Sequence, residues 1–444
     1  MTAKSLLKIY KIALPVLLLL LSLQHAVAAI TLSGDVTARN QTGTHTGEVY
    51  RNYLKADLNL NETFENTEVK AVLRAEDDSM RPGDDAAYLR GDTGIQRIYL
   101  REAYISHDFY FESFIDSINI KLGRIIYTWG NSDEVKPVDI INPQDYSNLY
   151  FTPIQERKYG VFSGTASIFF TENFFIEAVA IPEFKPSEIA SSVFEQDSMH
   201  ALIGLNGDNS IKQKLPDSDI KNSSYSGRIG LTLFDFDMHA NYFYGYGNLP
   251  VYKLQSLTPS ADNIMADYKK VQMFGFDFQR ALFSGISIRG EAAFFERGKY
   301  FAYNGAALMA DVAVGSTGSA EKRYTEYTIG FDDQDFIFDD MYLNLQFHQK
   351  IILSYEPGLA SDRYTNLVLW NLKYYMMNKK YRVSSQGACD IGERSVYANA
   401  EFMAKLADNF EFTIGTWMLE GKADTDIGQF DSNDMVYVSG ILTF

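Results

Sequence analysis

Apolar and polar residues alternate one by one through segment after segment of this chain. At its end, every second residue from Val436 to Phe444 falls on one side of an extended strand, while Tyr437, Ser439 and Thr443 fall on the other. Successive side chains of a strand point to opposite faces, so this pattern predicts a strand with one oily and one polar face. A chain built mainly of such segments is expected to be all-β.

The same two-residue period recurs upstream, and the connections between segments are alternately short and long. Short turns alternating with long loops are typical of bacterial barrels, in which the turns are periplasmic and the loops extracellular. Apolar sets alternate over residues 54–60, 69–75, 238–244, 274–278, 286–294, 341–347 and 396–402. The polar residues between them, which we expect to line the wall of a lumen, include Arg74, His239, Arg289, Glu291 and His348.

The predicted architecture is a transmembrane antiparallel β-barrel. About 17 segments are legible, and a single-chain bacterial barrel has an even strand number, so we expect about 18 strands, with 16 as the alternative. Residues 380–387 are the candidate for the weak strand. The longest loops are expected near residues 129–159, 183–224, 249–266 and 298–320.

Alternation alone would also suit a soluble sandwich, because a sandwich buries one face of each strand as well. The turns favour the membrane. Phe169-Phe170 and Phe174-Phe175 flank one tight turn. Rings gathered at a turn are typical of a membrane interface and are rare on a soluble surface.

The start of the chain has the pattern of an export signal. Three lysines precede an apolar run over residues 12–23, which is followed by small residues at 26–28. The apolar run is short for a membrane helix, which needs ~20 residues. We therefore predict a signal peptide over residues 1–28 and a barrel over residues 29–444.

The closing segment resembles the last strand of bacterial outer-membrane β-barrels, in which a terminal Phe serves as an assembly signal. The resemblance gives Phe444 that role, and it implies a location in the bacterial outer membrane and the barrel-assembly machinery as a partner. Outer-membrane lipids are expected around such a barrel.

The charge balance bears on partners. The chain has 40 basic and 57 acidic residues and a net charge of −17. Phosphate would be repelled, so nucleic acid is not an expected partner. The charge suggests divalent-cation bridging to lipopolysaccharide, although solubilised loops explain it equally well. Cys389 is the single cysteine, so no internal disulfide can form. No metal site or cofactor is predicted, because the histidines are scattered and no motif of either kind is present.

One segment has sequence motifs that the other loops lack. Residues 122–130 read LGRIIYTWG, and residues 139–145 read DIINPQD. These two runs resemble an outer-membrane family of porin-like barrels of unknown function that is often encoded beside RND-type exporters of lipids and hydrophobic compounds. Ile125 stands where that family usually has Gln. The resemblance implies transport or secretion at the outer membrane, with an RND-type exporter system as a candidate partner.

Arg124 raises a question of placement. The residues two, four and six positions before it are apolar and share one face. A regular strand would therefore turn Arg124 toward lipid, at a cost of ~2–4 kcal/mol at midplane depth. We predict a β-bulge at Gly123 that turns Arg124 into the lumen and Ile125 and Tyr127 outward.

The polar residues after Arg124 are candidates for a pore constriction. If their loop folds inward, one cation and several carboxylates create a field across the pore. The alternative is that Asp139 and Asn142-Pro143 are turn chemistry that organises the loop through bonds to the backbone, and the two interpretations can coexist. The constriction candidates are Arg124, Trp129, Asp133, Asp139, Asn142 and Asp145.

The function predicted from these features is a porin-like channel for passage or export-linked transfer of small or hydrophobic molecules. The alternatives are a plugged barrel within a lipid or hydrophobe transport system and a structural or adhesive barrel. No catalytic motif is present, so the chain is not expected to be an enzyme. The sequence does not specify an oligomeric state or a substrate.

Overall fold

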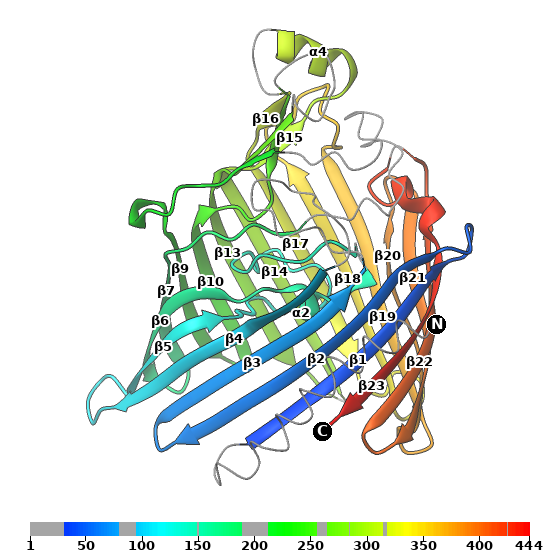
Figure 1. Cartoon of the computed structure of the whole chain (residues 1–444). Coiled ribbons are helices and arrows are strands. Elements are labelled where there is room, and N and C mark those ends of the chain that lie inside the picture. The colour runs from blue at the N-terminus through cyan, green and yellow to red at the C-terminus, as the bar shows by residue number, and fades with distance from the viewer. Residues whose placement is uncertain are drawn as a thin grey trace.

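Eighteen strands close into a single antiparallel barrel in the computed structural model (Figure 1). Closure occurs between the first and last strands, which pair from Asp35↔Thr443 to Gly43↔Met435. The predicted barrel of 18 strands is confirmed, and the weak candidate at 380–387 is a regular strand. The structure describes residues 31–79, 95–148, 151–188, 212–254, 264–283, 285–313, 318–423 and 425–444.

Each wall strand pairs with its predecessor along the chain, from the N-terminus to the C-terminus. In order they are β1 (Thr31–Gly43), β2 (Val49–Phe64), β3 (Thr67–Asp78), β4 (Ile95–Tyr110), β5 (Ser117–Ile125), β6 (Val161–Thr171), β7 (Phe174–Ile181), β9 (Ser224–Leu233), β10 (Phe236–Tyr246), β13 (Lys270–Ala281), β14 (Ile286–Arg297), β17 (Tyr324–Asp333), β18 (Met341–Ile352), β19 (Tyr364–Met376), β20 (Tyr381–Asp390), β21 (Ser395–Ala407), β22 (Phe410–Glu420) and β23 (Met435–Thr443).

The two ends of the barrel differ as predicted, with short turns at one end and long loops at the other. The turn between the alternating sets at 54–60 and 69–75 is tighter than those sets suggest, because β2 continues to Phe64 and β3 begins at Thr67. The predicted signal peptide lies outside the described residues. None of the helices in the described part of the chain is long and apolar enough to span a bilayer.

The long loops carry small elements of their own. These are the helices α2 (Ile154–Arg157), η2 (Ile220–Asn222), α4 (Gly305–Ala313) and η4 (Gly428–Asn433), a sheet of β8 (Lys212–Lys214), β11 (Val251–Leu254) and β12 (Ile264–Asp267), and a hairpin of β15 (Tyr300–Ala302) and β16 (Ser319–Glu321). The β15–β16 hairpin and α4 project above the barrel at the top of Figure 1.

Apolar side chains cover the outside of the wall, and polar side chains line the inside. Phe276 and Val438 are 45% and 41% exposed, whereas the inward Asn344 is only 2% exposed. This is the reverse of a soluble core and confirms the assignment of faces by alternation. Rings gather at the short-turn end, where Phe170 and Phe174 stack with centroids 5.2 Å apart. Phe444 lies on the outer face and is half exposed.

Placing a charge in the middle of the outer face tests this orientation. Phe276 lies midway along β13 and points away from the lumen. We expect Phe276→Arg to lower the free energy of unfolding from a bilayer by ~2–4 kcal/mol, because a cation at midplane depth loses its hydration. Denaturant titration of the protein in lipid vesicles measures the change. Phe276→Leu is the matched control, and equal stability of the two variants would contradict the assignment.

Candidate functional site

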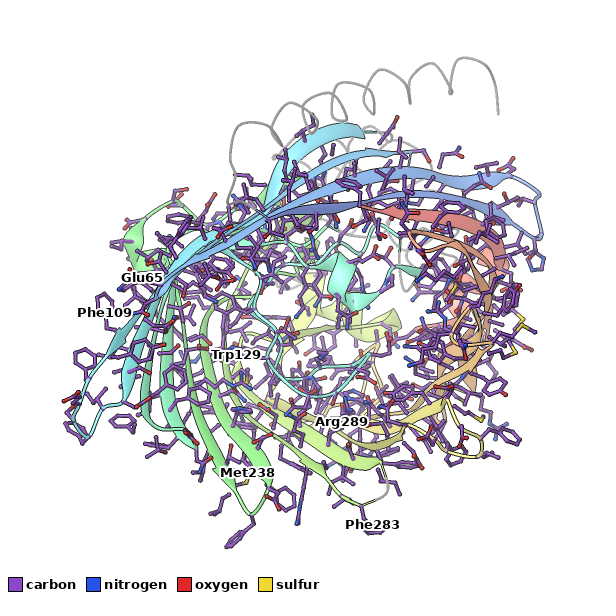
Figure 2. All side chains as sticks on the ribbon, turned by 90° about the horizontal axis from the view of Figure 1, so that it is seen from below. Glu65, Phe109, Trp129, Met238, Phe283 and Arg289 are labelled. Atoms are coloured by element: carbon purple, nitrogen blue, oxygen red, sulfur yellow. The ribbon has the colours of Figure 1, made fainter. Side chains whose placement is uncertain are left out.

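The long connection between β5 and β6, residues 126–160, folds into the barrel instead of away from it over its described residues, 126–148 and 151–160. We call it the inner loop. Figure 2 looks along the barrel from the short-turn end: Trp129 and Arg289 lie inside the ring of strands, and Phe109 and Phe283 lie outside it. Most inner-loop residues are buried, Trp129 being 3% exposed. The inner loop therefore occupies the lumen, as the constriction hypothesis requires.

The first half of the inner loop is bound to β14. Glu291 accepts hydrogen bonds from the backbone N–H groups of Ser132 at 2.8 Å and Val138 at 3.3 Å. Gly130 has φ +83°, and a Cβ there would lie 2.3 Å from the Glu291 carboxylate. Only glycine allows this close approach. Arg289 donates to the carbonyl of Asn131 at 3.0 Å.

Neighbouring strands hold the same part of the inner loop. Asn131 donates to Asp277 of β13 at 2.8 Å, and Asp133 pairs with Arg289 at 3.2 Å. The carbonyl of Val135 accepts from Thr328 of β17 at 3.3 Å. The loop is thus attached across β13, β14 and β17 by its backbone as well as by its side chains.

The second half of the inner loop is bound to the opposite wall. The Gln155 carbonyl accepts from Arg101 of β4 at 2.6 Å, and Glu156 lies 3.8 Å from Lys55 of β2. The ring of Phe151 packs on Trp417 of β22 with centroids 5.4 Å apart. Since β14 is the eleventh and β2 the second of the 18 wall strands, these attachments are half a turn apart and the loop crosses the lumen.

The side-chain amide of Asn142 organises the backbone of the inner loop, with its Oδ1 as acceptor and its Nδ2 as donor. The Oδ1 accepts from the N–H of Tyr127 at 2.7 Å, and the Nδ2 donates to the carbonyls of Ile125 at 3.0 Å and Tyr159 at 2.7 Å. Asp145 accepts from the N–H of Ser147, two residues on, at 2.9 Å. These bonds are the turn chemistry that the sequence offers as the alternative reading.

Asp139 forms a buried ion pair with Lys158, which also donates to the carbonyl of Tyr127 at 2.9 Å. Burial raises the pKa of Asp139 and lowers the pKa of Lys158, and the opposite charge of the partner counters both shifts. The pair joins the two arms of the inner loop, because Asp139 lies before the crossing and Lys158 after it.

Two apolar clusters fill part of the lumen at the ends of this crossing. The larger cluster packs Trp129 and Val138 of the inner loop on wall residues that include Met273 and Phe295. The smaller cluster packs Phe151 among residues of β22, β23 and the loop between them. Apolar burial therefore supports both attachments of the inner loop.

A cavity of about 580 Å³ lies on the long-loop side of the inner loop. Charged side chains of both signs line it, together with apolar residues such as Ile140 and Phe295. Burial raises the pKa of Glu134 above the ordinary value, against the nearby positive charge of Arg157. The charged lining residues are Glu134, Lys136, Asp139, Arg157, Lys269, Lys299, Glu326, Asp390 and Asp426.

The inner face of β2 to β4 carries paired charges. Arg74 binds Asp57 through two hydrogen bonds at 2.7 and 2.6 Å, and Arg51 binds Asp78 at 2.9 and 2.5 Å. The guanidinium of Arg101, on the same wall, lies within electrostatic reach of the guanidinium of Arg74. The predicted wall residue Arg74 thus faces inward within a fixed ion pair.

The predicted bulge at Gly123 is wrong. β5 keeps one register with both neighbours, so that Arg124 pairs with Ala103 on one side and Phe162 on the other. Gly123 has φ +141°, and a Cβ there would lie 2.2 Å from the Ala103 carbonyl oxygen. Glycine therefore adopts this backbone angle and allows the close approach of the Ala103 carbonyl, and the strand needs no extra residue. Arg124 stays on the outer face beside Phe162, which is 54% exposed, and lies outside the lumen.

Two consequences follow from this regular strand. Ile125 and Tyr127 are buried in the larger apolar cluster instead of pointing outward. Arg124 lies at the long-loop end of the wall, where an outward cation costs only ~0–1 kcal/mol. A register shift does occur in the neighbouring β4, where Arg101 falls between the partners of Val72 and Leu73.

The two inward histidines lie on separate parts of the wall. His239 of β10 contacts Asp277 at 2.8 Å, and His348 of β18 contacts Thr328 at 3.0 Å. The structure does not bring them together. Over the described ranges, no group of three or more His, Cys, Asp or Glu side chains could hold a metal ion.

Sequence reasoning missed several residues that fix the inner loop. Lys158 carries no local pattern that would mark it as the partner of Asp139. Asp277 is fully buried and binds Asn131, and its place in the alternation of β13 was a signal for an inward carboxylate. Arg228 of β9 lies over the Trp129 ring at 5.6 Å, a contact that only the closed barrel creates.

Comparison with known proteins gives a family and an architecture. A model of the family described as "Protein of unknown function (DUF1302)" matches residues 22–411. Among curated proteins, none matches the chain.

Solved structures of similar architecture are distant in sequence. The outer membrane channel DcaP of Acinetobacter baumannii is 10% identical, with 94% of this chain and 97% of that chain covered and a TM-score of 0.42. OccAB1 of A. baumannii is 8% identical, with coverage of 94% and 95% and a TM-score of 0.49. OccK5 (OpdH) of Pseudomonas aeruginosa is 10% identical, with coverage of 94% and 98% and a TM-score of 0.48.

Removing one member of the buried ion pair should loosen the inner loop. We expect Lys158→Met to weaken loop docking by ~3–5 kcal/mol, because Asp139 is left as an uncompensated buried charge. Hydrogen exchange of the 126–160 backbone measures the change. The double variant Asp139→Leu with Lys158→Met should restore most of the protection, since two apolar groups replace the pair. Exchange in the single variant as slow as in the unchanged chain would show that the pair does not hold the loop.

Proposed function

The chain therefore belongs to this family of unknown function, and we propose that it is a channel of the bacterial outer membrane whose constriction is the inner loop. A closed barrel with an apolar outer band is the architecture that crosses that membrane. In this proposal the long loops face outside the cell and the short turns face the periplasm. Small molecules pass through the lumen beside the inner loop.

The observation that carries the proposal is the crossing of the lumen by residues 126–160, attached to both walls. A barrel of this strand number is too wide for wall side chains alone to fill. A loop that crosses such a barrel narrows the interior and leaves part of it open. The charged cavity on the long-loop side then acts as the vestibule in which a solute is desolvated and selected.

Charge gives the constriction its selectivity. Glu156 lies within the electrostatic reach of Lys55, Arg39, Arg74 and Arg101, all on the wall of β1 to β4. The opposite arm of the loop carries Asp133, Glu134 and Asp139. Opposed cations and carboxylates set up a field across the pore, which discriminates among polar solutes by charge and dipole.

A second candidate rests on the apolar contents of the lumen. The larger cluster places Trp129, Val138 and Ile141 against wall residues where an aqueous pore would have water. This favours a plugged barrel that hands lipids or hydrophobic compounds on, with an RND-type exporter as its partner. Binding of lipopolysaccharide is a further proposal. An adhesive role would rest on residues 183–224, of which 189–211 lie outside the described residues.

Conductance separates the two candidates. The refolded chain in a planar lipid bilayer should show discrete current steps in potassium chloride if it is a channel. A barrel that inserts and stays silent would favour the plugged alternative. In that case, deletion in the cell should alter lipid or solvent sensitivity without changing solute permeability.

The anchor at Glu291 should control the width of the pore. Glu291→Ala removes two hydrogen bonds to a carboxylate, worth ~1.5–3 kcal/mol each, so the loop should leave the wall part of the time. We expect a larger and noisier single-channel current. Glu172→Ala, on the exposed turn between β6 and β7, is the matched control and should leave the current unchanged. Equal currents from Glu291→Ala and the unchanged protein would remove the inner loop from the role of constriction.

Glu134 should make ion selectivity depend on pH. Because burial raises its pKa, Glu134 takes up a proton at a higher pH than an ordinary glutamate does. The preference of the channel for cations should therefore fall early as the solution is acidified. Reversal potentials in a salt gradient measure it. Glu134→Gln should lower the preference at neutral pH and flatten its early decline, and Glu172→Gln should do neither. A titration of Glu134→Gln that matches the unchanged protein would place Glu134 off the pathway.

A further inference from the structure

The outer face of the barrel has a hollow that the channel proposal does not use. It lies on β5, β6, β7 and β9 and has a volume of about 450 Å³. These four strands are at the left of Figure 1. Small residues form most of its floor, and larger apolar residues stand at its edges. The floor residues are Gly164, Ala166, Ala178 and Ala180, and the edge residues include Ile120, Leu122 and Tyr225.

The strand register explains the shape of the hollow. Gly164 pairs with Leu122 on one side and Ala180 on the other, and Ala180 pairs with Tyr225. Across these four strands, two small residues, Gly164 and Ala180, therefore lie between two large side chains, those of Leu122 and Tyr225. The ladder is unbroken across these strands, so the hollow is a depression in the outer surface and not an opening in the wall.

A cation lies above the hollow on the same outer face, although it does not line the hollow itself. Arg124 is two residues beyond Leu122 on the same outer face, toward the long-loop end. Its Nη1 donates to the carbonyl of Gly160 at 3.1 Å, which holds the guanidinium against the wall. None of the carboxylates in the described ranges forms a salt bridge with it. A guanidinium with one neutral partner keeps most of its donors available for an anion.

We propose that the hollow and Arg124 together form a seat for one anionic lipid of the outer leaflet. An acyl chain fills the depression over Gly164 and Ala180, and a headgroup phosphate binds the guanidinium. Both parts of the seat match such a lipid: the apolar floor faces the acyl region, and the cation lies at the interface where phosphates are found. Arginine is well suited to this role, because its planar fork binds phosphate through two hydrogen bonds.

Charge favours this occupant over a second copy of the chain. The net charge of −17 makes two copies repel each other, whereas an outward cation on such a protein is a local exception that attracts an anion. The seat rests on the proposed outer-membrane location, but it does not require that the lumen conduct.

Lipid A, which carries phosphates and several acyl chains, is the probe for the test. The refolded barrel in detergent micelles is titrated with lipid A, and bound lipid is counted by native mass spectrometry. We expect one lipid to be retained by the unchanged chain and Arg124→Gln to weaken its binding about tenfold, the equivalent of losing the charged hydrogen bonds. Filling the hollow with Gly164→Leu or Ala178→Leu should abolish retention. Inorganic phosphate should compete poorly, because it lacks acyl chains.

Matched variants on other sectors of the wall complete the design. Arg363→Gln removes an exposed cation at the same end of the barrel, and Ala292→Leu enlarges an outward small residue of β14. Both should retain the lipid. Heat-dependent gel mobility shows that each variant has folded.

Three results would overturn the proposal: equal retention by Arg124→Gln and the unchanged chain, equal loss from the control variants, or a dimer that Gly164→Leu dissolves. Conductance of Arg124→Gln should match that of the unchanged chain. A silent barrel that still retains the lipid would count against the channel alone.

Discussion

The pairing of β1 with β23 is the constraint on which the rest of the structure depends. Inside a bilayer no water is available to a free backbone N–H or carbonyl, so a sheet can cross only if its last edge meets its first. Here the meeting runs from Asp35↔Thr443 to Gly43↔Met435. Once it is made, every strand has an inner and an outer face, and the alternation of the chain assigns its polar residues to one and its apolar residues to the other.

Closure at this strand number creates a second problem, because the interior is wider than wall side chains can fill. The inner loop fills part of this interior. A loop inside a barrel carries backbone groups that water reaches poorly, and each needs a partner. Asn142 supplies such partners to Tyr127 and Tyr159 of the loop and to Ile125 at the end of β5, and Glu291 supplies two from the wall. The polar side chains that the sequence marks as candidates for the constriction and the lumen wall are therefore also the structural supports of the loop.

The charged residues of the inner and outer faces of the wall differ in their partners. Inward cations such as Arg74 have carboxylate partners in the wall, and together with Arg101 they lie within the electrostatic reach of the inner-loop residue Glu156. The outward Arg124 has no such partner among the described residues and lies beside a hollow of small side chains. One short segment, residues 122–130, thus serves two environments: its first part shapes the lipid-facing surface, and its last part enters the lumen as the start of the inner loop.

The sequence by itself determined the class of fold, the faces of the strands and the positions of the turns and long loops, because a two-residue period and turn residues are local properties that do not depend on the neighbouring strand. The sequence also distinguished the segment over residues 122–145, which contains the start of the inner loop, from the other loops. Only the tertiary structure decided that Arg124 stays outside, because the absence of a bulge depends on the registers with β4 and β6. The same holds for the pairing of Asp139 with Lys158 and of the loop backbone with Glu291. Those contacts join residues that are far apart in the chain, and they exist only after eighteen strands have closed around the loop.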